Sequence, residues 1–202
     1  MATEEWTMQA RTILSAVAIV AAAVSMNAGV ASAENQTGSV YNNVRYNFGS
    51  NTWKMDSKYL PAEVSYNTSE KPGTVIISTR KKYLYVVQEG GKAKRFGIGV
   101  GRRGFRWRGE EKVSRKAEWP AWHPPAEMRE REPHLPVRME GGEDNPLGAR
   151  ALYLGNTLYR IHGTHQPWTI GESVSSGCIR LRNEDVISLY DMVKVGAKVI
   201  VD

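Results

Sequence analysis

The chain has 202 residues, of which 41% are hydrophobic and 24% charged, with a formal net charge of +6 at neutral pH. This length suits a single domain with a sizeable core and a tail. The basic residues are scattered along the chain and do not line one helix face, which argues against a nucleic-acid-binding protein.

A secretion signal is predicted for residues 1–33. Arg11 is followed by an uncharged run rich in Ala, Val and Ile, and an Ala-Ser-Ala cleavage site ends the segment. Translation can begin at Met1 or at Met8, and Met8 gives the better basic start. The alternative is a membrane anchor, but the apolar run is marginal in length and lacks a basic stop-transfer flank. We therefore expect export, with no stable membrane span after cleavage.

Residues 34–72 are rich in Asn, Ser, Thr, Tyr and Lys and show little periodicity. They are predicted to form a linker or lead-in, with one short strand near Ala62–Tyr66. The globular domain is expected from residue 73 to residue 202.

Three short strands are expected next, over Thr74–Ser78, Tyr83–Val87 and Ala93–Val100. These segments are rich in β-branched and aromatic residues, and a Gly-Gly pair supplies a tight turn, so the pattern predicts an antiparallel meander. The segment from Gly101 to Gly148 is predicted to be loop-rich, because its six prolines disfavour central strands. We interpret it as an ordered excursion that shapes a cleft.

One helix is predicted, over Asn183–Val193, where apolar residues recur at helical spacing and Asn183 is the expected N-cap. The final "AKVIVD" is predicted to be a strand. The expected fold is therefore mostly β.

Cys178 is the only cysteine, and an unpaired thiol in an exported protein is an oxidation liability unless it is buried or used. His162 ends an apolar strand-like run sixteen residues earlier and is the candidate base. Gly177 permits a sharp turn, so that the N–H groups of Gly177 and Cys178 can face an oxyanion. Arg180 shares a face with Cys178 in an extended chain, where it can hold a substrate carboxylate. A buried, inert thiol and a surface arginine remain the alternatives.

Metal binding is the competing chemistry, because His162, His165 and Cys178 are three possible zinc ligands. Gly163 and Pro167 oppose the helix that this histidine spacing requires, and no fourth ligand has motif spacing. The order of histidine before cysteine differs from papain-like peptidases. Sortases share this order, but their histidine lies farther upstream of the cysteine.

The segments "IHGT" and "IGESVSSGCIRL" together resemble the signature of the YkuD-type L,D-transpeptidases. That signature is a His, a variable stretch, and then [Ser/Thr]-[His/Ser]-Gly-Cys-hydrophobic-[Arg/Asn]. The similarity extends upstream through "GVGRRGFRW", "KAEWPAWHPP" and "EGGEDNPLGARALYLG", and downstream through "NEDVISLYDMVKVGAKVIV". It covers Gly73 to Asp202.

The resemblance implies a mostly antiparallel, β-sandwich or barrel-like catalytic domain with one or two short helices, located in the periplasm or cell wall. Cys178 would attack a peptidoglycan stem tetrapeptide after its meso-diaminopimelate and release the terminal D-alanine. An amine of a second stem would resolve the thioester to give a 3→3 cross-link. Neither a metal nor an organic cofactor is implied.

The resemblance also implies roles for individual residues. His162 would be the base, and the Gly163 carbonyl would orient its imidazole. Ser176 stands where some members carry a second His, so a role specific to that His does not transfer. Arg180 stands where others carry Asn and is carried over as a substrate-carboxylate contact.

The acyl acceptor stays open between a second stem, an amine of an outer-membrane protein, and water. A third class of function is a non-catalytic wall-binding domain with a buried Cys178. The remaining aromatic and histidine residues are expected to be structural or on the surface; these are Trp107, Trp119, Trp122, Trp168, His123, His134 and His165.

Overall fold

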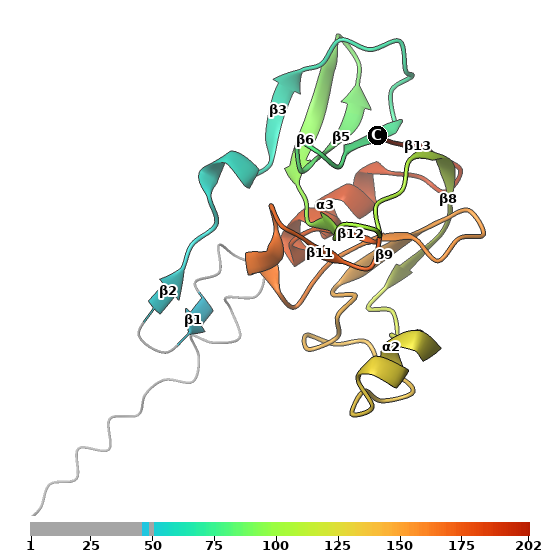
Figure 1. Ribbon diagram of the computed structural model, residues 1–202. Helices are drawn as coiled ribbons and strands as arrows, with labels where there is room; N and C mark the ends of the chain where they lie inside the picture. The colour runs from blue at the N-terminus through green and yellow to red at the C-terminus, as the bar shows by residue number, and fades with distance from the viewer. Residues whose placement is uncertain (1–45, 49–50) are drawn as a thin grey trace, which may run out of the picture. The chain divides into compact units, whose positions relative to one another are not determined.

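The computed structural model describes residues 46–48 and 51–202 (Figure 1). The predicted secretion signal and the two possible start positions lie outside the described residues. Within the described ranges, we find no helix with the length and apolar character needed to cross a bilayer.

One nine-stranded sheet forms the framework, in the order β12-β10-β9-β8-β13-β4-β5-β6-β3. Neighbouring strands are antiparallel except for two parallel pairs, β10 with β12 and β13 with β4. In chain order the strands are β3 (Ala62–Ser65), β4 (Val75–Ser78), β5 (Tyr83–Gln88), β6 (Lys92–Gly97), β8 (Gly109–Glu118), β9 (Arg150–Leu154), β10 (Arg160–His162), β12 (Ile179–Arg180) and β13 (Lys198–Val201).

Shorter elements complete the described chain. Strands β1 (Tyr46–Phe48) and β2 (Asn51–Trp53) form a separate antiparallel pair, and β7 (Val100–Gly101) and β11 (Ser173–Ser175) pair in parallel. The helical elements are η1 (Ser57–Tyr59), α2 (Ala126–Arg131), η2 (Pro167–Thr169) and α3 (Asn183–Met192). The mostly β fold with few short helices is confirmed.

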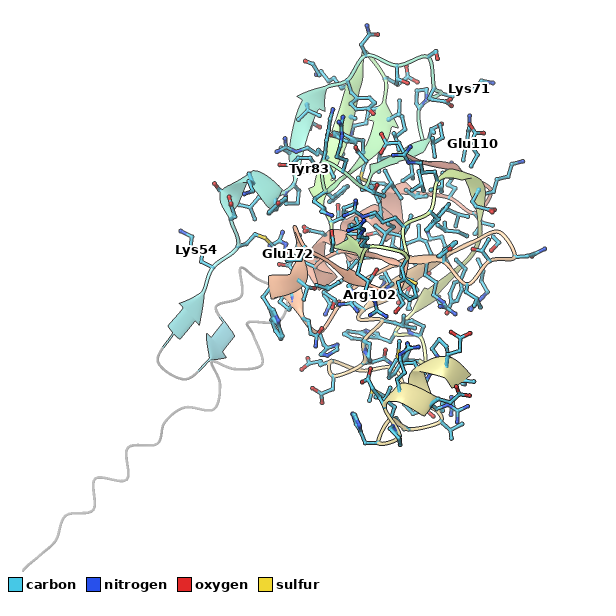
Figure 2. All side chains as sticks on the ribbon, viewed as in Figure 1. Lys54, Lys71, Tyr83, Arg102, Glu110 and Glu172 are labelled. Carbon is cyan, nitrogen blue, oxygen red and sulfur yellow. The ribbon has the colours of Figure 1, made fainter. Side chains whose placement is uncertain are left out.

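The hydrophobic core takes alternate side chains from the strands and the apolar face of α3, which packs on β9. Side chains fill the space between the elements (Figure 2). The largest fully buried side chains of the core are those of Phe96, Ile77, Leu84, Ile98, Leu152, Leu154, Ile161, Ile179, Leu181 and Leu189.

Two sequence-based predictions need correction in this sheet. The third predicted strand ends at Gly97, because Gly99 exchanges two 2.9 Å backbone hydrogen bonds with Arg180. Strand β8 is ten residues long and lies between β9 and β13, inside a segment that was predicted to be loop-rich. The prolines of that segment all follow β8, and residues 119–148 are irregular apart from α2.

The late helix is present, but Asn183 is not its N-cap. Arg182 occupies the N-cap position, and its guanidinium makes two 2.7 Å hydrogen bonds to Asp185. The Asn183 Oδ1 instead accepts a 2.9 Å hydrogen bond from the Ala149 N–H. Asn183 therefore ties the start of α3 to the start of β9.

The lead-in is more closely joined to the domain than its composition suggests. Strand β3 extends the sheet by pairing with β6, close to the predicted position of a short strand. The Tyr59 backbone lies so close to Gly97 that a Cβ there would be 2.6 Å from the Tyr59 carbonyl oxygen. The Tyr59 ring lies equally close to Gly171, two residues before β11. Tyr59 thus joins the lead-in to the segment that precedes Cys178.

We predict that Gly97→Ala lowers the free energy of unfolding by about 1–3 kcal/mol, because the added methyl must push η1 away from β6. Gly142→Ala is the matched control, since nothing lies within 4 Å of a Cβ at that position. Urea denaturation of both variants and the parent checks this. Equal stabilities of the two variants would contradict the close contact.

Candidate active site

The parallel pairing of β10 with β12 brings the predicted catalytic residues together. Ile161 pairs with Ile179, and His162 pairs with Arg180. Since side chains alternate along a strand, the two isoleucines enter the core while His162 and Arg180 share the other face. Cys178 comes directly before β12 and, in the same alternation, lies on the face of Arg180.

A tight turn presents the thiol. Cys178 is partly buried, and its Sγ lies 3.8 Å from the carbonyl oxygen of Leu158. The Ser175 hydroxyl donates to the Cys178 carbonyl at 2.6 Å and accepts from the Gly177 N–H at 3.2 Å. Ser175 therefore fixes both sides of the turn, while Ser176 is exposed at its outer edge. The backbone N–H of Arg102, a residue labelled in Figure 2, donates to the Ser175 carbonyl at 2.9 Å.

A glycine is required at position 177, both by the backbone conformation and by the neighbouring side chain. Its φ of +108° is in the region that favours glycine, and a Cβ would lie 2.6 Å from Cε1 of Tyr159. The Trp107 Nε1–H donates to the Gly177 carbonyl at 3.1 Å, and the Trp107 and Tyr159 rings stack with centroids 4.5 Å apart. These two aromatic residues pack against the turn that carries Cys178. Sequence reasoning missed this role, because neither residue lies near Cys178 in a recognisable pattern.

His162 is buried, with 4% of its surface exposed. Its Nδ1 lies 2.6 Å from the Gly163 carbonyl oxygen, which can only accept, so Nδ1 carries the proton and Nε2 remains an acceptor. Burial, together with the charges of Arg180 and Arg160, lowers the pKa of His162 to about 3, against the opposing effect of the carbonyls of Gly163 and Leu147. The imidazole is therefore neutral at physiological pH and Nε2 can accept a hydrogen bond, while the lowered pKa makes the ring a weaker base than a free histidine.

Asn183 helps to position this histidine through the neighbouring Gly163. A Cβ on Gly163 would clash with the Asn183 Oδ1, and a Cβ on Gly148 would clash with the same atom. The Gly163 N–H donates to the Arg150 carbonyl at 3.0 Å. These contacts fix the peptide whose carbonyl orients His162.

Arg180 contributes positive charge to the site. Its Nε is buried without a hydrogen-bond partner, and none of the ion pairs found in the described part of the chain uses this residue. Burial lowers the pKa of Arg180, while interaction with Cys178 opposes that effect. His165, which was expected to be structural or on the surface, is half-buried, and its pKa is lowered first by burial and then by the charge of Arg180. The arrangement thus offers an unpaired cation to an anionic ligand.

The zinc-binding alternative lacks its ligand set. Over residues 46–48 and 51–202, no three His, Cys, Asp or Glu side chains are grouped so that they could hold a metal ion. The arrangement of thiol, neutral imidazole and cation is instead suited to nucleophilic chemistry on an anionic substrate.

Comparison with known families supports this assignment of the fold. Residues 72–201 match the model of the YkuD family, described as an L,D-transpeptidase catalytic domain. The chain belongs to the YkuD L,D-transpeptidase family.

Two proteins of similar sequence are compared first. The chain is 38% identical to the probable L,D-transpeptidase YbiS of Escherichia coli K12 over 149 residues, which are 69% of this chain and 47% of YbiS. It thus spans about half the length of the curated relatives it matches. It is 48% identical to a Brucella melitensis structure titled a probable carnitine operon oxidoreductase, with a TM-score of 0.50 over 71% of this chain and 93% of that chain.

A third comparison concerns the fold alone. The catalytic domain of the Enterococcus faecium L,D-transpeptidase, solved by NMR, is 16% identical, with a TM-score of 0.51 over 67% of this chain and all of that one. In the YkuD domain of the present chain, the signature histidine ends β10 and the signature cysteine precedes β12.

The buried histidine gives this YkuD domain a predicted pH dependence. The folded-state pKa of His162 is about 3 and the ordinary value is 6.5, so the unfolded chain binds a proton first as the pH falls. The contribution to stability is complete above pH 6.5 and is lost progressively towards pH 3. We expect His162→Gln to flatten the decline in unfolding free energy over this range, by at most about 1.4 kcal/mol per pH unit. Parallel pH profiles of parent and variant, measured by denaturant titration, would contradict the assignment.

Proposed function

We propose that the chain is an exported, cysteine-dependent L,D-transpeptidase that forms 3→3 cross-links between peptidoglycan stem tetrapeptides. The observation that carries this proposal is the placement of the only thiol and a buried neutral imidazole on one face of β10 and β12. Family membership supports the reaction class. We assign residues 1–33 to the secretion signal, 34–72 to the lead-in and 73–202 to the catalytic domain of a periplasmic or wall-associated enzyme.

In the first step, Nε2 of His162 accepts the proton of the Cys178 thiol. The contact between the thiol and the Leu158 carbonyl must break first, and the catalytic contact with the base often forms only with substrate bound. The sulfur adds to the carbonyl that follows meso-diaminopimelate. The C–N bond to the terminal D-alanine then breaks, and the departing amine takes the proton from His162. A thioester acyl-enzyme results.

The oxyanion formed in this step needs hydrogen-bond donors. The Gly177 N–H already donates to the Ser175 hydroxyl, so we assign the principal oxyanion contact to the Cys178 N–H. The Gly163 carbonyl accepts from Nδ1 and stabilises the imidazolium while it exists. Arg180 would hold a substrate carboxylate.

In the second step an amine attacks the thioester, loses a proton through His162 and releases the thiol. A side-chain amine of a second stem gives the 3→3 cross-link. The same acyl-enzyme with an amine of an outer-membrane protein would anchor that protein, and water would give a carboxypeptidase. The alternative of a non-catalytic wall-binding domain requires an inert thiol, which the partial exposure of Cys178 disfavours.

Mass spectrometry of muropeptides tests the proposal. Purified protein incubated with tetrapeptide-rich peptidoglycan should release D-alanine and produce 3→3 dimers. We expect Cys178→Ala to abolish both products and His162→Gln to slow them about 10²- to 10⁴-fold. His134→Gln, at an exposed position in the irregular segment, should match the parent.

Each other outcome identifies a different reaction. Shortened stems without dimers would assign water as the acceptor. Release of D-alanine that leaves Cys178 acylated, with neither dimers nor shortened stems, would direct the search to a protein amine. Unchanged peptidoglycan together with an unmodified Cys178 would contradict the enzyme assignment.

A further inference from the structure

A row of side chains runs from Cys178 across three strands on the same face of the sheet. Arg160 on β10 pairs with Tyr153 on β9, and Tyr153 pairs with Arg115 on β8. The parallel register of β10 and β12, continued back by one residue, sets Arg160 opposite Cys178. The next row along the strands contains His162 and Arg180.

Contacts within this row connect it to the nucleophile. The Arg115 Cζ lies 3.6 Å from the centre of the Tyr153 ring, and the Arg160 Cζ lies 5.2 Å from it. The Arg160 Nη1–H donates to the Leu158 carbonyl at 3.0 Å. The same carbonyl oxygen is the one that lies 3.8 Å from the Cys178 Sγ. The guanidinium of Arg160 and the thiol of Cys178 therefore both contact the Leu158 carbonyl oxygen.

Arg115, Tyr153 and Arg160 line a pocket of about 310 Å³, which we call the arginine pocket. Its other lining residues include Trp122 and His123 from the irregular segment. No Asp or Glu is found among its described lining residues, whereas a pocket of about 580 Å³ elsewhere on the sheet contains both Glu110 and Glu111. Glu110 is labelled in Figure 2.

The two arginines of the arginine pocket have no carboxylate partner of their own. None of the ion pairs found in the described ranges includes Arg115 or Arg160, and the Arg160 Nε is buried without a hydrogen-bond partner. A guanidinium presents a planar fork of donors that matches a carboxylate, and stacking on Tyr153 fixes the plane of that fork. The pocket is thus prepared for an anionic group on a peptide held at Cys178.

We propose that the arginine pocket binds a carboxylate of the substrate peptide, separate from the one assigned to Arg180, and that Arg160 and Arg115 determine specificity for it. This inference rests on the proposed function. Arg160 belongs to the row of Cys178 and Arg180 to the row of His162, so the two cations approach the reacting carbonyl from different positions. The enzyme would accordingly select stems with free carboxylates over stems in which one is amidated.

Two carboxylates of the tetrapeptide have the required chemistry. One is on the side arm of the diamino acid before the scissile bond, and the other is the terminal carboxylate of the departing D-residue. Three synthetic tetrapeptides separate them: one with both groups free, one amidated on the side arm and one amidated at the terminus.

Binding of these peptides is measured by calorimetry on the chain carrying Cys178→Ala, so that no turnover occurs. Arg160→Gln, Arg160→Lys and Arg115→Gln are each added to that background. Arg95→Gln is the matched control, because Arg95 also stacks on a tyrosine, with its Cζ 4.5 Å from the centre of the Tyr83 ring, and also has a buried Nε without a partner. Thermal melts verify that each variant is folded, and Arg115→Gln carries the test if Arg160→Gln does not fold.

We expect amidation of one of the two carboxylates to weaken binding about 10- to 100-fold, and Arg160→Gln to weaken binding of the free peptide by a similar factor. The Arg160→Gln variant should bind the free peptide and that amidated peptide with equal affinity. The amidation that no longer weakens binding in this variant identifies the carboxylate that the pocket holds. Arg160→Lys should retain part of the discrimination, and Arg95→Gln all of it.

Two results would overturn the proposal, and they are distinguishable. Tight binding of the free peptide with unchanged discrimination in the Arg160 and Arg115 variants would refute the arginine pocket and leave the proposed function intact. Failure of the free peptide to bind the Cys178→Ala chain would refute the proposed substrate, and the pocket assignment with it.

Discussion

The parallel pairing of β10 with β12 is the constraint on which the whole site depends. Parallel neighbours cannot be joined by a hairpin, so the chain after His162 must make a long excursion before it returns. That excursion contains η2 and β11 and ends in the turn at Gly177. The short strands are stabilised by burial of Ile161 and Ile179 and by the hydrogen bonds between Arg180 and Gly99. The reacting groups are therefore positioned by core packing and not by contacts with each other.

The electrostatics of the site follow from the same placement. A histidine inside the domain, next to a cation and without a carboxylate partner, remains neutral, and its orientation comes from a backbone carbonyl. Such a base does not hold a permanent ion pair with the thiol. Arg160 and Arg180 lie on the same face, so that their positive charges lower the pKa of His162 and also face a bound ligand. Acidic peptides would be attracted to the site before any chemistry begins.

Local sequence patterns predicted part of this structure. The motif gave Cys178 and His162 as candidate site residues, which the fold places on neighbouring strands, and β-branched runs located β4, β5 and β13. Strand β8 was not predicted, because only Val113 among its ten residues is fully buried and its polar composition resembles a loop. The stacking of Trp107 on Tyr159 and the alignment of Arg160 with Cys178 depend on register between distant strands, which no local pattern encodes.

The position of β13 has a consequence for how the domain is made. This strand lies between β4 and β8 and joins the four strands that carry the site to the four that begin at β4; the two hydrogen bonds between Gly99 and Arg180 make a second connection. Residues 198–201 are the last strand along the chain, so until they are added both neighbours present open edges. The site half of the sheet therefore gains its central neighbour only when residues 198–201 are in place, and its edge at β8 is open to non-native pairing until then.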